Sequence, residues 1–225
     1  MKVAALYDVH AMPGPLAAVL DDVAVEGVDR IVFGGDILIG PRPREAIDLA
    51  RAAGGMFILG NCDRQPEEWE HEHVDAETLA WLASLPLTFS CDGVLYCHAA
   101  PDDDMLIVTE ATPDDVLAPA YAAVDEPVVV IGHTHHQFDR RVGRHRIVNA
   151  GSVGMAYEGD VAAYWALLEG GEPTFRRTEF DVEAAAADLR ASGWPGAEEF
   201  VRENLLAAPT RAEAVAHFEQ LRMTR

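Results

Sequence analysis

The sequence contains little cysteine and no long apolar run. The three cysteines are Cys62, Cys91 and Cys97, and no two of them have the C-x-x-C spacing. Such a sparse, odd set argues against a disulfide framework and favours a reducing compartment. No stretch approaches the ~18 apolar residues of a membrane span, and Asp8 interrupts the N-terminal apolar run. We therefore expect a cytoplasmic protein without a membrane partner.

Positive charge is also scarce. Lysine and arginine number 17 against 38 acidic residues, which gives a formal net charge of −21. A nucleic-acid binder normally presents a basic face, so we do not expect a nucleic-acid partner, and a nuclease is disfavoured. An anionic substrate would have to be attracted by bound cations instead.

The chain has enough apolar residues for a packed α/β core. Hydrophobic residues make up 49% of the 225 positions, which suits one domain. Apolar runs at 3–7, 30–35 and 55–60 predict strands, and the apolar spacing over 16–23 and 43–53 predicts helices between them. This order predicts parallel strands in a buried sheet, with ligands gathering beyond their carboxyl ends.

The second half of the chain predicts a further sheet and terminal helices. Residues 87–91 and 94–97 predict a hairpin that turns at Asp92-Gly93, and 128–131 predicts a buried strand. The strand-rich stretch 138–180 is expected to supply a second sheet. We therefore expect an α/β fold of two sheets flanked by helices over residues 1–180. Helices over 182–192, 197–207 and 211–222 form an extension, 181–225, that packs on this domain or makes an oligomer contact, such as a homodimer.

Polar clusters follow five of the predicted strands. They are Asp8-Val9-His10, Gly35-Asp36, Gly60-Asn61-Cys62-Asp63, Cys97-His98 and Gly132-His133-Thr134-His135. Taken singly, each has an ordinary explanation as a turn or a core histidine. Together they offer seven metal-ligating side chains: Asp8, His10, Asp36, Asn61, His98, His133 and His135. Mixed imidazole and carboxylate ligands suit Mn, Fe or Zn better than Ca.

The spacing within these clusters suggests how they would converge. Asp8 and His10, like His133 and His135, are two residues apart, so an extended backbone would point each pair the same way. Two ions about 3.5–4 Å apart need a shared ligand, and a carboxylate is the natural bridge. Asp36 stands alone at its strand end and is the best candidate.

The five clusters resemble the signature of the calcineurin-like metallophosphoesterase superfamily, which reads D-x-H, G-D, G-N-[HC]-[DE], H and G-H-x-H. The stretches 35–41 and 149–154 further resemble the bacterial YfcE-like phosphodiesterase branch. The resemblance extends over about residues 3–168. It implies a four-layer α/β/β/α sandwich. It also implies a first metal on Asp8, His10 and His135, a second on Asn61, His98 and His133, and Asp36 as the bridge.

The implied function is hydrolysis of a small phosphodiester or phosphomonoester by in-line attack of a metal-bound hydroxide. Two divalent ions, Mn²⁺ first with Fe or Zn as alternatives, would serve as cofactors. Catalytic roles would then fall to Asp36, Asn61 and His98. The alternative is a catalytically weak or inactive protein-binding module, as in the retromer subunit that shares this fold; the intact ligand set favours the enzyme.

Departures from the pattern affect the pocket rather than the metals. Many members have histidine where this chain has Cys62, and a thiol is a weaker donor to a leaving group. If Cys62 acts in catalysis, we therefore expect substrates with good leaving groups to be favoured. The alternative is that Cys62 is only a small packed residue. Arg64 and Arg42 are candidate contacts for a substrate phosphate, the alternative being solvated side chains.

Overall fold

The computed structural model describes residues 1–224, and its first sheet contains the N-terminal strands. The strand order is β10-β9-β1-β2-β3. Strand β1 (Lys2–Leu6) pairs in parallel with β2 (Arg30–Phe33), which pairs in parallel with β3 (Met56–Phe57). On its other edge β1 pairs antiparallel with β9 (Ala163–Glu169), which pairs with β10 (Glu172–Thr178).

The second sheet has the order β4-β5-β6-β8-β7. The predicted hairpin is present as β4 (Thr88–Cys91) and β5 (Val94–Cys97). Strand β6 (Val128–Ile131) pairs in parallel with both β5 and β8 (His145–Asn149), and β7 (Phe138–Val142) completes the edge. Both sheets are therefore mixed.

The two sheets pack against each other through apolar side chains. Val3 and Ala5 of β1 belong to the same buried cluster as Tyr96 and Val130 of the second sheet. Alternate β1 residues, Ala4 and Leu6, point instead into the cluster under the helices. Because both faces of β1 are buried, the strand needs a continuous apolar run rather than an alternating one.

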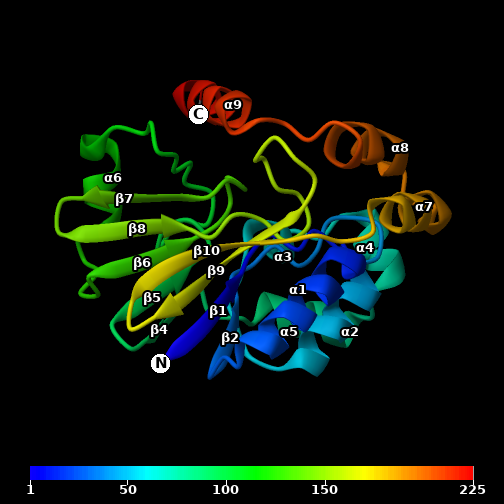
Figure 1. Ribbon diagram of the computed structural model, residues 1–225, viewed down its shortest axis with the longest axis horizontal. Helices are drawn as coiled ribbons and strands as arrows, with labels where there is room; N and C mark the ends of the chain where they lie inside the picture. The colour runs from blue at the N-terminus through cyan, green and yellow to red at the C-terminus, as the bar shows by residue number, and fades with distance from the viewer. Residues whose placement is uncertain (225) are drawn as a thin grey trace.

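Helices cover the outer face of each sheet (Figure 1). The first sheet carries α1 (Pro13–Glu26), α2 (Pro43–Ala53) and α5 (Ala76–Ala83), and the second carries α6 (Asp114–Tyr121). Two short helices, α3 (Asn61–Arg64) and α4 (Glu68–His73), lie between β3 and α5. The result is the four-layer α/β/β/α sandwich that the family resemblance implied.

The expectation that residues 138–180 supply the second sheet is confirmed for one half of the stretch and wrong for the other. Strands β7 and β8 join the second sheet, whereas β9 and β10 return to the free edge of β1. Apolar patterning identifies strands but not their partners, and the second sheet needed strands from the hairpin and from β6 as well.

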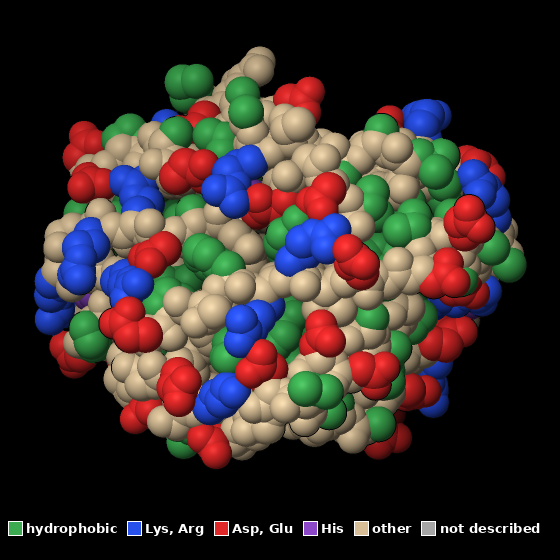
Figure 2. Space-filling model, in the orientation of Figure 1, with side chains coloured by type: hydrophobic (Ala, Val, Ile, Leu, Met, Phe, Trp, Pro, Cys, Tyr) green, Lys and Arg blue, Asp and Glu red, His purple; other side chains and the backbone are tan. Residues whose placement is uncertain are grey.

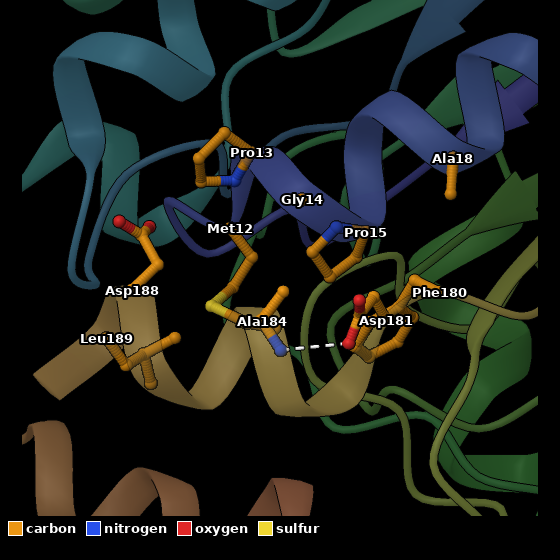
Figure 3. A pocket seen from close by; sticks show the side chains of 11 residues that line it. Met12, Pro13, Gly14, Pro15, Ala18, Phe180, Asp181, Ala184, Asp188 and Leu189 are labelled. Atoms are coloured by element: carbon orange, nitrogen blue, oxygen red, sulfur yellow. Dashed lines mark hydrogen bonds between the residues drawn. The ribbon is translucent and has the colours of Figure 1, made fainter.

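The C-terminal helices dock on the same chain. They are α7 (Val182–Ser192), α8 (Ala197–Phe200), a π-helical turn (Val201–Leu205) and α9 (Arg211–Thr224). Figure 3 shows α7 beside the start of α1, where Leu189 shares a buried cluster with Met12. Within residues 1–224, no helix combines the length and apolarity needed to cross a membrane. The domain boundary at 180 and a homodimer remain predictions.

Candidate metal centre

All seven predicted ligands follow the carboxyl ends of parallel strands. Asp8 follows β1, Asp36 follows β2, Asn61 begins α3, His98 follows β5 and His133 follows β6. Since the sheets face each other, these strand ends meet at one edge of the sandwich. The fold thus brings together residues more than a hundred positions apart.

The backbone at these ligands is not extended, which corrects the reasoning from spacing. Five of the seven have positive φ: Asp8, His10, Asp36, His133 and His135. Each such residue costs of order 1–3 kcal/mol, and strain of this kind concentrates at functional sites. His133 and His135 enter different groups, whereas Asp8 and His10 enter the same one.

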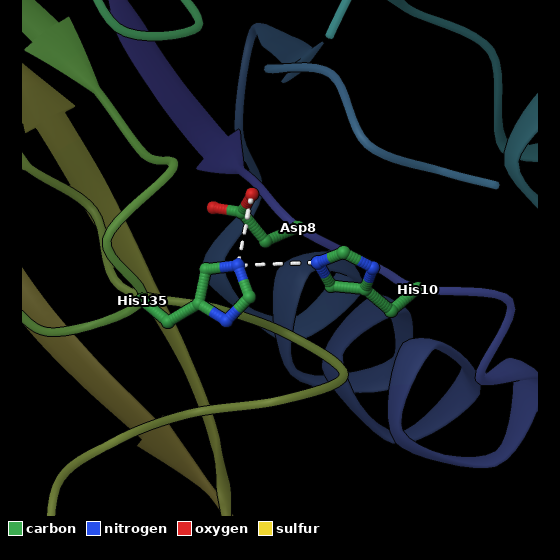
Figure 4. A group of neighbouring side chains, drawn as sticks. All are labelled: Asp8, His10 and His135. Atoms are coloured by element: carbon green, nitrogen blue, oxygen red, sulfur yellow. Dashed lines mark hydrogen bonds and ion pairs between the residues drawn. The ribbon is translucent and has the colours of Figure 1, made fainter. Parts of the chain in front are cut away.

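The first group is Asp8, His10 and His135, whose ligand atoms all lie within 4.8 Å of one another. The Nε2 atoms of the two histidines are 3.1 Å apart, and Nε2 of His135 lies 3.4 Å from Oδ1 of Asp8 (Figure 4). Burial and the neighbouring His135 lower the pKa of His10 to about 4. The imidazole of His10 is therefore neutral at pH 7 and has a lone pair for a cation.

The second group is Asp36, His98 and His133, again within 4.8 Å. Oδ2 of Asp36 lies 3.3 Å from Nε2 of His98. Burial alone would lower the pKa of His98, but the Asp36 carboxylate outweighs it and raises that pKa to about 10. Burial and His98 lower the pKa of His133 to about 4. A cation bound here would replace the proton of His98.

The two groups adjoin, since Nε2 of His98 lies 3.9 Å from Oδ1 of Asp8. The Asp36 carboxylate is held ionised: burial would raise its pKa, but the imidazoles of His98, His10 and His133 lower it. His10 belongs to the first group, and His98 and His133 belong to the second. The Asn61 Oδ1 lies 3.0 Å from Nε2 of His98.

The donor set fits bound cations on one further observation. Oδ1 of Asp8 is buried and has no hydrogen-bond partner among the described residues. The amide of Asn61 lies 3.0–3.3 Å from Oδ2 of Asp36, Nδ1 of His133 and Nε2 of His98, so it can donate its NH₂ to them or turn its oxygen toward a cation. A buried acceptor without a donor is costly unless a positive charge lies beside it.

Backbone carbonyls set the orientation of two imidazoles. Nδ1 of His98 lies 2.9 Å from the carbonyl of Gly34, and Nδ1 of His135 lies 2.8 Å from that of Met155. A carbonyl accepts only from N–H, so these contacts place a proton on Nδ1 of each ring. This leaves Nε2 as the atom of each ring that a metal would take, as metal-ligating histidines require.

Asp63 supports the site from beneath. Its buried carboxylate accepts hydrogen bonds from the backbone N–H groups of Asp36, Ile37, Leu38 and Gly60 at 2.8–3.3 Å. It therefore ties the turn after β2 to the turn after β3. The sequence contained the signal, the acidic residue of G-N-x-[DE], but gave no role for it.

Close approach explains two of the glycines. A Cβ on Gly60 would lie 2.2 Å from Oδ1 of Asp36, and one on Gly132 would lie 2.4 Å from Oδ2 of Asp8. Neither contact is tolerable between fixed atoms. These positions need glycine because the carboxylates pass directly over the backbone.

Cys62 lies beside the site as a neutral thiol. Its backbone N–H donates to Oδ1 of Asp36 at 2.8 Å, and its side chain is half-buried. Burial and the Asp36 charge raise the pKa of the thiol far above its ordinary value. In the metal-free site Cys62 is therefore a neutral thiol, and its role in catalysis remains a prediction.

Both arginines named as substrate contacts have acidic partners. Arg64 makes a two-pronged pair with Asp104, at 2.7 and 2.9 Å, and Arg42 pairs with Asp188 of α7 at 2.8 Å. Asp104 and Asp188 carried no sequence signal that would assign them to these arginines. Substrate contact by either arginine remains a prediction.

The fold and site coincide with a known family. The family model described as the calcineurin-like phosphoesterase superfamily domain matches residues 1–170, so the chain belongs to that superfamily and is a metal-dependent phosphoesterase. The family also implies divalent metal ions and a small-molecule substrate.

Individual relatives extend the likeness over most of the chain. A metallophosphoesterase from Sphaerobacter thermophilus is 29% identical and has a TM-score of 0.75, over 92% of this chain and 99% of that one. An uncharacterized protein of Methanocaldococcus jannaschii is 24% identical over 88% of this chain and 97% of its own length. The fold is also that of the phosphoesterase YfcE from E. coli, which has a TM-score of 0.50 and 19% identity over 80% of this chain and all of that one.

Proposed function

We propose that this chain hydrolyses a small phosphoester with the help of two divalent ions, one in each ligand group. The observation that carries this is the pair of adjoining, largely buried ligand groups, Asp8-His10-His135 and Asp36-His98-His133, in which Oδ1 of Asp8 and Nε2 of His98 lie 3.9 Å apart. Two such ions would neutralise charge on the phosphoryl group and lower the pKa of a water held between them.

Each ligand has a defined part in this proposal. Asp8, His10 and His135 would hold one ion, and Asn61, His98 and His133 the other, with Asp36 contacting both. The carbonyls of Gly34 and Met155 keep two imidazoles in the required tautomer, so the site is organised before a substrate arrives. Mixed nitrogen and oxygen donors are compatible with Mn²⁺, which we take as the first choice over Fe or Zn.

The surroundings favour a small substrate. Figure 2 shows acidic side chains interspersed with basic ones on one face, without a continuous basic track there. The formal net charge of −21 opposes binding of a long polyanion. With a neutral thiol at Cys62, we expect diesters or monoesters with good leaving groups to be cleaved fastest.

The test is hydrolysis of bis(p-nitrophenyl) phosphate and p-nitrophenyl phosphate by Mn²⁺-loaded protein. Asp36→Asn should lower kcat by at least about 100-fold, because changes even to outer partners of metal ligands cost 10–100-fold. Asp139→Asn, on β7 and paired with Arg146, is the matched control and should leave kcat unchanged. Full metal loading without turnover of any mono- or diester would overturn the proposal and favour a protein-binding module.

A further inference from the structure

A cleft of about 560 Å³ lies between the loop after β8 and the C-terminal helices. Its walls bring together residues from the loop, the π-helical turn and α9. They include Tyr157, Glu203, Asn204, Glu213, His217 and Phe218. The loop and the segment before α9 are joined by a hydrogen bond from the N–H of Gly159 to the carbonyl of Pro209, and Figure 1 shows this segment passing beside the loop.

The cleft begins one side chain away from the metal centre. The ring of Tyr157 stacks on that of the predicted ligand His135, with centroids 5.0 Å apart and planes at 29°. The N–H of Tyr157 also donates to the carbonyl of His135 at 3.0 Å. On the cleft side, the ring of Phe218 lies 6.3 Å from that of Tyr157. The Tyr157 ring thus borders the predicted ligand His135 on one side and the cleft on the other.

The chemistry of the walls selects among such groups. Among the described residues that line the cleft, none is a lysine or an arginine, and two are glutamates. A second phosphate would therefore be repelled by these two carboxylates, even though Glu203 is itself paired with Arg202 at 2.8 Å. A planar uncharged ring can stack on Phe218, and its amino groups can donate to Glu203, Glu213 or the Asn204 amide oxygen.

The position of α9 is fixed by polar contacts with the main domain. The hydroxyls of Thr109 and Thr112 donate to the carboxylate of Glu219 at 2.8 and 2.5 Å. Arg211 pairs with Glu158 at 2.7 Å at the start of the helix. The cleft is therefore formed before any ligand arrives, which reduces the entropic cost of binding.

We propose that this cleft binds the alcohol part of the substrate and selects a phosphoester whose alcohol carries an uncharged planar ring, such as a nucleobase. The proposal rests on the proposed function, because the phosphate is taken to lie at the metal centre. It gives the C-terminal helices a part in specificity, with Phe218 as the residue on which the ring stacks.

The first experiment measures binding of adenosine and of ribose to the Mn²⁺-loaded protein by equilibrium dialysis, so it does not depend on turnover. Adenosine should bind and ribose should not. Phe218→Leu keeps an apolar side chain but removes the ring, and should weaken adenosine binding at least about fivefold, since base stacking on an aromatic ring contributes that much or more. Phe175→Leu removes an exposed ring on β10 and should have no effect.

The second experiment compares kcat/KM for AMP and ribose 5-phosphate, each as the monoester and as the methyl diester. In the two monoesters, and again in the two methyl diesters, the phosphate is carried by the same ribose oxygen, so the compounds compared differ in the base. The proposal predicts a preference for the base-bearing ester that Phe218→Leu removes. Adenosine binding without hydrolysis would leave the cleft assignment standing and refute the proposed function. Hydrolysis of nitrophenyl esters without adenosine binding or base preference would refute the cleft assignment alone.

Discussion

Replacing Asp63 by asparagine should destabilise the protein more than its single-atom change suggests. The carboxylate accepts four backbone N–H groups, two on each oxygen: Oδ2 from Asp36 and Gly60, Oδ1 from Ile37 and Leu38. An asparagine side chain has one acceptor oxygen, so its NH₂ group must face two backbone donors. Burial and the Asp36 charge raise the pKa of Asp63 to about 7, so the comparison is made at pH 9, where the carboxylate is ionised. Two charge-assisted hydrogen bonds are then lost, at about 1.5–3 kcal/mol each, which gives a loss of about 3–6 kcal/mol.

The assay is urea unfolding of chelator-treated protein, followed by far-ultraviolet circular dichroism, so that bound metal does not contribute. Asp48→Asn is the matched control. Its carboxylate pairs with Arg44, both side chains are about half exposed, and such pairs contribute at most about 1 kcal/mol. If Asp63→Asn costs no more than Asp48→Asn, the carboxylate does not hold the two turns together and the reasoning fails.

The remaining predictions concern the ligands and their neighbours. Metal binding at pH 8 should release about one proton from His98, because a pKa of about 10 keeps this histidine protonated in the metal-free site. Titration calorimetry in buffers of different ionisation enthalpy should show the release as a binding heat that changes with the buffer. A binding heat that does not depend on the buffer would contradict the prediction. Cys62→His should raise the ratio of kcat/KM for an alkyl phosphodiester to kcat/KM for a nitrophenyl phosphodiester by about tenfold or more, because an imidazolium can protonate a poor leaving group. An unchanged ratio would show that a side chain at position 62 does not protonate the leaving group. Gly60→Ala should lower the free energy of unfolding by about 1–3 kcal/mol and weaken metal binding, because the added Cβ would lie 2.3 Å from the backbone nitrogen of Asp36. Gly14→Ala is the control, since a Cβ there has no neighbour within 4 Å. Equal unfolding midpoints for the two variants would refute the packing argument.

Local elements were predictable because local signals define them. The α2 helix occupies 43–53 as expected, with proline in its first turn, and β6 occupies 128–131, an apolar run followed by glycine. The pairing of β9 with β1 was not predictable, since it joins residues more than 160 positions apart. The apolar pattern of a strand does not indicate which other strand it pairs with. Residues 197–207, expected to be one helix, form α8 followed by a π-helical turn.

The candidate site, like the fold, was predictable only in part. The identities of the seven ligand candidates followed from strand ends and from the resemblance, and the structure places them together. The left-handed backbone at Asp8 and His133 was missed, because nothing in the one-letter pattern distinguishes an extended x-spaced pair from a turn. Tyr157 was missed as well, since a stacking contact with His135 depends on how the loop after β8 folds back.

The central claim, two ions joined by Asp36, can be tested directly by anomalous scattering from crystals grown with Mn²⁺. The account predicts two peaks: one coordinated by Asp8, His10 and His135, the other by Asn61, His98 and His133, with the Asp36 carboxylate bound to both. A single peak, or two peaks without a shared Asp36, would contradict it.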